Sequence, residues 1–520
     1  MLEIYNPYAI AAISALGGFL FGTDISSVSA FLGVDSYLNY FNHPNDTTQG
    51  GITAAMPGGA FIGALIAGPV SNRLGRKKSI ILSTICWAIG CILSCAAQNV
   101  AMLVVGRFIK GICVGWTSGQ VPVYLAEQSP RAIRGRLVGT QQIAITIGIL
   151  VMFYVSYGCS FINGVGAFRL GVIATLNSVE LVLIFVSAWA LQIIPGALLG
   201  LLMPLCPESC RWLAAHGRME EAEQVIAKIH NLPIDSAEVQ LQIDEIREAL
   251  RIEKESAEIG YTDLFKKKLL SRTIAGMACQ LWRELCGVNV MMYYVVYVFQ
   301  MAGLTGNTNL ISSSIQYVIN FAMTIPALIW VDKWGRRPTL LVGSALMAAF
   351  LFATAGLLAN YGHYVDSVEG NANVRWSVSG PPSKGVIACS YLFVASFAIT
   401  WGPVSWIYVS EIFPRPVRAQ GSGLATATNW IMNFALSFFV PPAFKNIQWK
   451  TYLVFGVFCV ASFIQVFFTF HETKGRSLED ISTLFETSIT PFSKKATLSP
   501  LSHDSSPHPD DLKEHITASE

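Results

Sequence analysis

The sequence predicts an all-α integral membrane protein with twelve transmembrane helices arranged as two six-helix halves. Of its 520 residues, 52% are hydrophobic and 13% are charged, whereas about a quarter of the residues of an ordinary soluble protein are charged. Apolar stretches of about twenty residues, the length that crosses a bilayer, recur along the chain, and a basic motif occurs at matching places in its two halves. The net charge of +2 gives no reason to expect a nucleic-acid partner.

The predicted spans form two groups of six. The first group lies near residues 11–31, 51–70, 80–97, 100–125, 137–157 and 190–205. The second lies near 273–302, 310–331, 339–358, 385–410, 421–440 and 452–470. We divide the chain into a first half at 1–206, a loop at 207–272, a second half at 273–472 and a tail at 473–520.

The loop and the tail differ in composition. Apolar residues recur at helical spacing over 220–229 and 239–252, which predicts short cytoplasmic helices that brace the inner gate. The tail is rich in Ser, Pro, His and Asp, a composition typical of disorder.

Basic residues in short loops predict the orientation, because Lys and Arg gather on the cytoplasmic side. They cluster on one side of the spans at Arg73, Arg76, Lys77, Lys78, Arg131, Arg134, Arg136, Lys333, Arg336, Arg337, Arg415 and Arg418. The alternate loops at 32–50, 97–100 and 301–310 contain no Lys or Arg. Both termini are therefore expected in the cytoplasm, and Asn45, in an Asn-Asp-Thr acceptor pattern, is a glycosylation candidate in an outer loop.

The two halves share an internal repeat. The sequence NRLGRK at 72–77, after the second span, returns as DKWGRR at 332–337, after the eighth. A repeat of six spans predicts two parallel halves, with a substrate site between them near the middle of the membrane.

Polar side chains inside the spans are candidates for that site, because such groups are costly in a bilayer and face the bundle interior. Pairs four residues apart share a helix face: Gln142 and Thr146, Gln280 and Glu284, Gln316 and Asn320, and Asn429 and Asn433. Trp430 adjoins the last pair, and Trp401 and Trp406 flank a helix-breaking Gly402-Pro403. Amides and indole faces suit a polyhydroxylated ligand, but the same amides also bridge packed helices. Both interpretations remain open at this point.

Two charges in the first half indicate a different chemistry. Asp24 lies inside the first span and Arg107 inside the fourth. A buried carboxylate favours protonation and a nearby guanidinium favours its ionised form. The pair is either a proton site whose affinity changes with conformation or a static buried ion pair.

Eight ordered motifs between residues 16 and 479 give the chain a family resemblance. They read GGFLFGTDISS, NRLGRKK, GRFIKGICVG, YLAEQSPRAIRG, PESCRWL, GVNVMMYY, WGPVSWIYVSEIFP and HETKGRSLE. With them the chain resembles the sugar porters of the major facilitator superfamily, and the fungal hexose transporters in particular. The resemblance implies the major facilitator fold.

The resemblance also implies roles for individual residues. The sugar-binding positions fall on Gln142, Asn289, Asn320, Trp401, Asn429 and Trp430, and the proton-coupling pair falls on Asp24 and Arg107. The cytoplasmic gate network falls on Arg73, Gly75, Arg76, Glu127, Arg134, Glu208, Arg211, Arg336, Glu411 and Arg418.

The chain departs from the family pattern inside the sugar site. Where the family usually has a Gln-Gln pair, this chain has Arg283 and Glu284. Helix neighbours point about 100° apart, so we expect the two not to pair side by side and at least one to face the cavity. An ionised Glu284 accepts hydroxyl protons but donates none, which leaves open a sugar, another polyol or a sugar acid as substrate, or a loss of transport.

A second departure is the apolar stretch at 171–188, GVIATLNSVELVLIFVSA, which separates segments that the family joins almost directly. An additional single crossing there would place later basic loops outside. Our hypothesis is a translated intron, and a genuine tandem insertion is the alternative. Transcripts that always contained these codons would refute the intron hypothesis.

The preferred function is proton-coupled uptake of a monosaccharide, a hexose, by alternating access at the plasma membrane. The expected partners are the sugar, protons and the lipid bilayer, without cofactor, metal or nucleic acid, and we expect a functional monomer. A facilitative uniporter and a non-transporting sugar sensor are the alternatives. Nothing suggests ATP as the driver of transport, because no Gly-x4-Gly-Lys-Ser/Thr loop is present. An enzyme is not expected, because no His-Glu-x-x-His motif or comparable catalytic cluster stands out.

Overall fold

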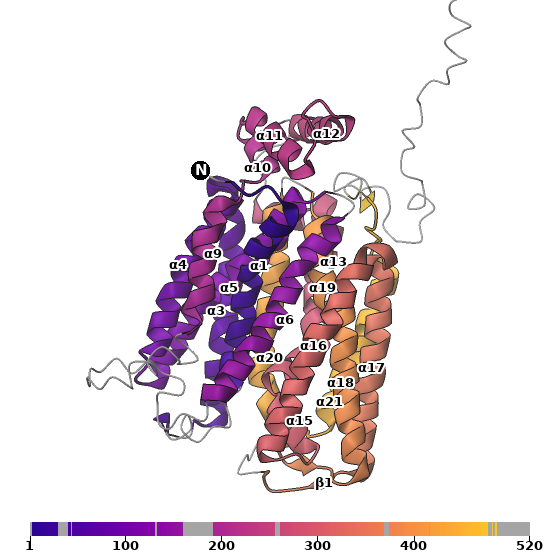
Figure 1. The fold of residues 1–520 in the computed structure, drawn as a ribbon. Coiled ribbons are helices and arrows are strands. Elements are labelled where there is room, and N and C mark those ends of the chain that lie inside the picture. The colour runs from indigo at the N-terminus through magenta and orange to yellow at the C-terminus, as the bar shows by residue number, and fades with distance from the viewer. Residues whose placement is uncertain are drawn as a thin grey trace, which may run out of the picture.

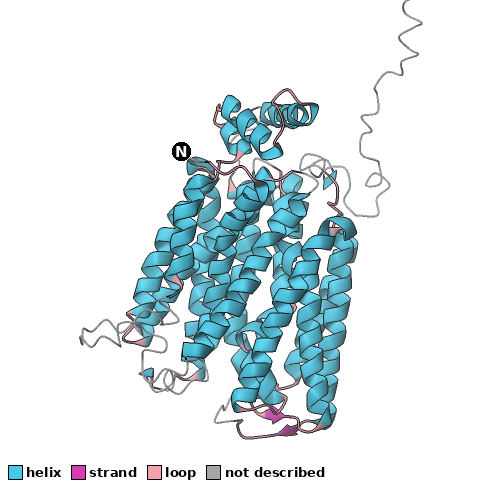
Figure 2. Ribbon diagram, viewed as in Figure 1, coloured by secondary structure: helices cyan, strands magenta, loops and turns pink. Residues whose placement is uncertain are grey.

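A computed structural model describes residues 3–29, 40–42, 44–130, 133–159, 191–254, 260–368, 374–414, 417–476, 481 and 484–485. The stretch at 171–188 and nearly all of the tail lie outside these residues. The described chain is almost entirely helical, with a short two-stranded hairpin at one end of the bundle (Figure 2).

The helices form two side-by-side groups (Figure 1). The first group contains α1 (Pro7–Ser29), α3 (Asp46–Leu74), α4 (Arg76–Cys95), α5 (Val100–Gln128), α6 (Arg134–Cys159), α9 (Ile193–Leu202) and the 3₁₀ turn η3 (Met203–Leu205). The second contains α13 (Lys267–Leu285), α14 (Val288–Tyr293), α15 (Val295–Met301), α16 (Gly306–Trp334), α17 (Arg336–Tyr361), α18 (Pro381–Ile399), α19 (Trp401–Ile412), α20 (Arg418–Asn446) and α21 (Lys450–Thr469).

The elements outside the bundle distinguish its two ends. The loop forms α10 (Cys210–Ala215), α11 (Met219–His230), α12 (Ala237–Lys254) and η4 (Tyr261–Phe265). Helices α10–α12 cover the end at which the chain starts, here called the α10–α12 end (Figure 1). The opposite end carries the hairpin of β1 (His363–Tyr364) and β2 (Trp376–Ser377). The two predicted loop helices correspond to α11 and α12.

The described elements fit the predicted twelve-helix arrangement. Nine helices in the described residues are long and apolar enough to cross a membrane. The sixth, seventh and eleventh crossings are α9 with η3, the broken α13–α15, and α20. The tenth crossing breaks at Thr400, next to the predicted Gly402-Pro403, so this prediction is confirmed.

The repeated motif forms the same turn in both halves. Gly75 joins α3 to α4 with φ 95° and ψ 162°, and Gly335 joins α16 to α17 with φ 90° and ψ 164°. A Cβ added at Gly75 would lie 2.3 Å from Oε2 of Glu208. Glycine is therefore required there both by backbone conformation and by the close carboxylate.

Gly75→Ala is expected to lower the stability of the protein on the order of 3 kcal/mol, since it adds backbone strain and displaces Glu208. Gly217→Ala is the matched control, because Gly217 has φ 77° with open space around its Cα, and should cost only about 1 kcal/mol. Thermal unfolding of both variants in detergent measures the difference. Equal melting temperatures would contradict the role given to Glu208.

Candidate functional site

Arg283 and Glu284 form a buried ion pair on α13. Nη1 of Arg283 lies 2.7 Å from Oε1 of Glu284, and neither side chain is exposed. The expectation that these neighbours cannot pair was wrong, because the long arginine side chain spans the angle between them. The guanidinium also lies over Trp406, 5.0 Å from the ring centroid, and over Phe397 at 5.5 Å, a favourable cation–π arrangement.

The Glu284 carboxylate binds two of the predicted amides of the second half, Asn289 and Asn429. The third, Asn320, instead donates its Nδ2 to the Met292 sulfur. Asn429 Nδ2 donates to Oε1 at 2.7 Å, and Asn289 Nδ2 donates to Oε2. Asn429 also donates to Oε1 of Gln280, one turn before Glu284. Because α13 ends at Leu285 and α14 begins at Val288, the break in the seventh crossing lets Asn289 turn back toward Glu284.

Two indole N–H groups connect the halves beside this cluster. Trp406 on α19 donates to Oε1 of Gln142 on α6 at 3.2 Å, and Trp430 on α20 donates to the Ser118 hydroxyl on α5 at 3.1 Å. The Trp430 ring packs edge-on against Phe21 of α1, with centroids 4.8 Å apart. Both donors are buried, so the interface at this level is polar and aromatic.

Trp401 lies elsewhere. Its indole N–H donates to the Leu340 carbonyl and the Ser344 hydroxyl on α17. Residues five apart on a helix point roughly 140° apart, so Trp401 and Trp406 cannot face the same cavity. The structure brings Trp406, which the sequence analysis named without assigning it to the site, to the cluster in place of Trp401.

Several buried polar atoms near this level have no hydrogen-bond partner among the described residues. They include Oδ1 of Asn429, Oδ1 of Asn320 and both amide atoms of Gln141. Buried polar groups are normally paired. Unpaired carbonyl oxygens are the groups that a ligand with many hydroxyl donors would satisfy.

The carboxylate of Asp24 lies in the first half with two cations. Oδ2 is 3.1 Å from Nη2 of Arg107, and Oδ1 is 2.5 Å from Nζ of Lys110. The pair predicted from sequence is therefore in contact, and Lys110 is an addition that the sequence analysis missed. The sequence feature that could have indicated Lys110 is its charge, which lies three residues after Arg107 within an apolar stretch.

At the α10–α12 end, the predicted gate residues of the first half form one network. Glu127 accepts from Nε and Nη2 of Arg76 and from the Ser209 hydroxyl. Glu208 accepts from the backbone N–H groups of Arg76 and Lys77 at the start of α4. Burial raises the pKa of Glu208, so these donors do not fully offset its loss of hydration.

The second half repeats this network. It contains the predicted pair of Arg336 and Glu411, together with Glu472 and Thr473, which the sequence analysis did not assign to the gate. Glu411 accepts from Arg336 and from the Thr473 hydroxyl, while Glu472 accepts from the N–H groups of Arg336 and Arg337 at the start of α17. Glu472 thus corresponds to Glu208. The repeat NRLGRK and DKWGRR could have revealed it.

Contacts between the halves close this end. Asp332 on α16 binds Nη2 of Arg336 and accepts from the backbone N–H of Arg136 on α6. Tyr261 of η4 donates to the Leu65 carbonyl on α3 and lies 3.4 Å from a Cβ built at Gly423 on α20. Burial raises the pKa of Tyr261 to about 12, so it remains a donor.

The remaining predicted gate residues occupy two environments. Arg134, Arg211 and Arg418 are buried, and Arg418 interacts electrostatically with Glu127 across the halves. Arg73 is exposed. Asn45, the glycosylation candidate, is exposed at the opposite end and accepts from the Thr48 N–H to cap α3.

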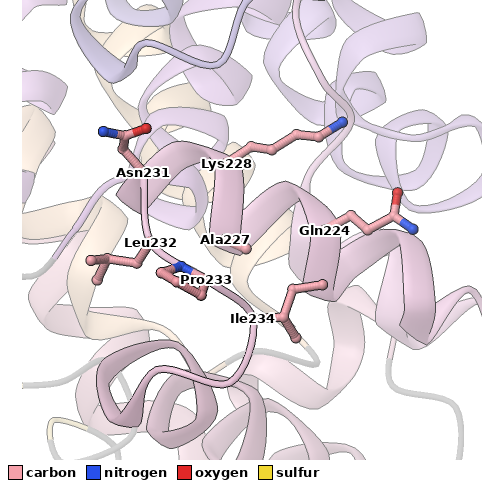
Figure 3. Close-up of a pocket in the computed structure, with 7 residues that line it drawn as sticks. All are labelled: Gln224, Ala227, Lys228, Asn231, Leu232, Pro233 and Ile234. Carbon is pink, nitrogen blue, oxygen red and sulfur yellow. The ribbon is translucent and has the colours of Figure 1, made fainter.

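A shallow pocket lies on the surface of the loop helices, lined by Gln224, Lys228, Asn231 and Ile234 among others (Figure 3). It belongs to α11 and the turn that follows, outside the bundle. It is separate from the polar cluster between the halves.

A sequence profile described as sugar (and other) transporter matches residues 10–485. The chain belongs to the sugar transporter family of the major facilitator superfamily. Members of this family are transporters rather than enzymes. A high-affinity glucose transporter of Kluyveromyces lactis is 48% identical over 492 residues, which cover 94% of this chain and 86% of that protein.

Solved structures of a related transporter show the same fold. The proton:xylose symporter XylE bound to 6-bromo-6-deoxy-D-glucose superposes with a TM-score of 0.75 at 27% identity, covering 92% of this chain and 98% of that one. The inward open conformation of XylE from E. coli gives 0.63 at 26% identity, with coverage of 92% and 99%. This transporter therefore resembles the sugar-bound form more than the inward open one, in agreement with its closed α10–α12 end.

The positions of the two tryptophans give a direct test of the site. Trp406→Phe removes the donor to Gln142 and should raise the KM of sugar uptake roughly two- to tenfold, the equivalent of one hydrogen bond. Trp401→Phe is the matched control and should leave KM unchanged, because its partners lie on α17. A rise in KM that is larger for Trp401→Phe than for Trp406→Phe would show that Trp401 contributes to the sugar site, as the sequence predicted.

Proposed function

We propose that this transporter takes up glucose or a similar hexose together with a proton, by alternating access at the plasma membrane. The observation that carries the sugar assignment is the buried group of amides and indoles that joins the halves at Gln142, Asn429, Trp406 and Trp430. Asn289 and Asn320 belong to the same proposed site. The glucose transporter of K. lactis supports a hexose as substrate.

The Arg283–Glu284 pair fits a neutral sugar. The guanidinium is occupied by Glu284 and two aromatic rings, so the charge that would attract a sugar acid is already compensated. The unpaired Asn429 and Asn320 carbonyl oxygens accept hydroxyl protons and would repel a carboxylate.

Asp24 and Arg107 are the proposed proton-coupling pair. The similarity to a proton:xylose symporter supports coupling. Facilitative uniport is the second candidate, and a specific observation favours it: the Asp24 carboxylate contacts two cations, Arg107 and Lys110, and a proton that binds there must compete with both.

We assign the α10–α12 end and both termini to the cytoplasm, because the basic loops at Arg76 and Arg336 lie there. The ion pairs of Arg76 with Glu127 and of Arg336 with Glu411 would then close the inner side. Their release, together with loss of the Asp332 and Tyr261 contacts, would open the sugar site to the cytoplasm. We expect the monomer to carry out this cycle.

The test is labelled-glucose uptake in yeast that lacks its own hexose transporters, with and without a protonophore, at confirmed surface expression. Uptake that collapses with protonophore supports symport, and resistant uptake supports uniport. Glucose binding without uptake would support a sensor. A version lacking residues 171–188 should be compared in parallel, since the intron hypothesis predicts that it transports at least as well as the full chain.

A further inference from the structure

The two cations beside Asp24 are held in different ways. Arg107 lies against Oδ2 and donates Nε to the Ile52 carbonyl on α3 at 2.9 Å. Lys110 lies against Oδ1 at 2.5 Å and is 1% exposed. The site therefore contains one buried carboxylate and two buried cations, and such a surplus of positive charge within a membrane span is costly.

Lys110 has a second acceptor within reach. Its Nζ lies 2.8 Å from Oε1 of Gln192 and 5.7 Å from the centroid of the Trp87 ring. Gln192 is fixed, because its side-chain Nε2 donates to the Thr23 carbonyl and its backbone carbonyl accepts from the Trp87 indole. The ammonium of Lys110 thus bridges Asp24 and a rigid neutral amide.

The surroundings of Asp24 add no other charge among the described residues. Helix α14 contributes Tyr293 and α4 contributes Cys91, both within electrostatic range. Helix α6 contributes no charge there, because its backbone near Ile145 and Ile149 packs against Gly22 and Ser26 of α1. The residue that precedes α9 is the neutral Gln192. Protonation of Asp24 is therefore opposed by Arg107 and Lys110 alone.

We propose that Lys110 competes with the transported proton for Oδ1 of Asp24, and that Gln192 retains the Lys110 ammonium when the proton binds. In this step an O–H bond forms on the carboxylate, Lys110 keeps its own protons, and only its contact with Oδ1 is lost. Lys110 is thus a positioning residue that sets the external pH at which Asp24 takes up a proton. The inference deepens the proton coupling proposed above and rests on it.

The test is the external-pH profile of glucose uptake for the full chain and three variants at equal surface expression. Lys110→Met keeps most of the length of the side chain and removes its charge, so the pH of half-maximal uptake should rise by at least about one unit, a tenfold change in proton concentration. Lys110→Arg keeps the charge and should stay close to the parent. Lys384→Met, at an exposed position of α18, is the matched control and should not shift.

Gln192→Met provides an independent variant. Without the neutral acceptor, Lys110 stays on Asp24, so half-maximal uptake should move to lower pH. If Lys110→Met fails to reach the surface, this shift decides the proposal.

Two results would overturn the proposed competition between Lys110 and the proton. One is an unchanged pH of half-maximal uptake in Lys110→Met. The other is an unchanged or higher pH of half-maximal uptake in Gln192→Met. A parent that is insensitive to pH and protonophore would refute proton coupling of the natural chain. If uptake by Lys110→Met were pH-dependent in that case, the competition of Lys110 with the proton would still stand. If uptake by both the parent and Lys110→Met were independent of pH, proton coupling and the competition would both be refuted.

Discussion

Arg283→Gln alone is expected to reduce glucose uptake at least tenfold, and Arg283→Gln/Glu284→Gln to restore most of it. Glu284 is fully buried, and removing one partner of a buried ion pair leaves an uncompensated charge that costs about 3–5 kcal/mol. Glu284→Gln alone should be similarly harmful, since the Arg283 guanidinium would then lack its anion. The double variant is neutral and retains amide donors and acceptors beside Asn289 and Asn429.

The measurement is the initial rate of labelled-glucose uptake at equal surface expression for the two single variants and the double variant. The matched control is Arg218→Gln/Glu221→Gln, which removes an ion pair with side chains 50% and 53% exposed on the loop and should change little. Normal uptake by Arg283→Gln would show that the pair lies outside the transport cycle.

Asp24→Asn is expected to abolish accumulation of sugar against its gradient while leaving exchange of internal for external sugar. The variant cannot carry the proton, but the sugar site around Gln142 and Asn429 is unchanged. Because it leaves Arg107 and Lys110 without their anion, Asp24→Asn/Lys110→Met, which restores the charge of the native cluster, should be examined beside it. Accumulation ratios and counterflow in intact cells distinguish the two activities. Undiminished accumulation in either variant would refute Asp24 as the coupling residue.

The sequence predicted most of the architecture because membrane spans and basic loops leave strong signals. Apolar length set the positions of the spans, and the repeated NRLGRK and DKWGRR motifs indicated that both halves turn alike. Gly75 and Gly335 indeed adopt nearly the same backbone conformation. The short sixth crossing and the broken seventh depend on packing, which hydrophobic length does not encode.

The site was predicted less completely, because side-chain direction after a helix break cannot be obtained from spacing. Helix α19 begins at Trp401, after the break at Thr400, and the rotation that follows places Trp406 at Gln142. The pairing of Arg283 with Glu284 depends on the length of the arginine side chain, which the angle between neighbouring residues on a helix does not include. Lys110 could not be assigned from spacing alone, because only the packing of α5 against α1 shows that its ammonium reaches Asp24.

The most direct test of proton-coupled sugar transport is glucose accumulation by the purified protein in liposomes with an imposed inward proton gradient. We predict that internal glucose rises above the external concentration while the gradient lasts, and that Asp24→Asn liposomes only equilibrate. Equilibration by the unmodified protein, at the same level with and without the gradient, would contradict the account.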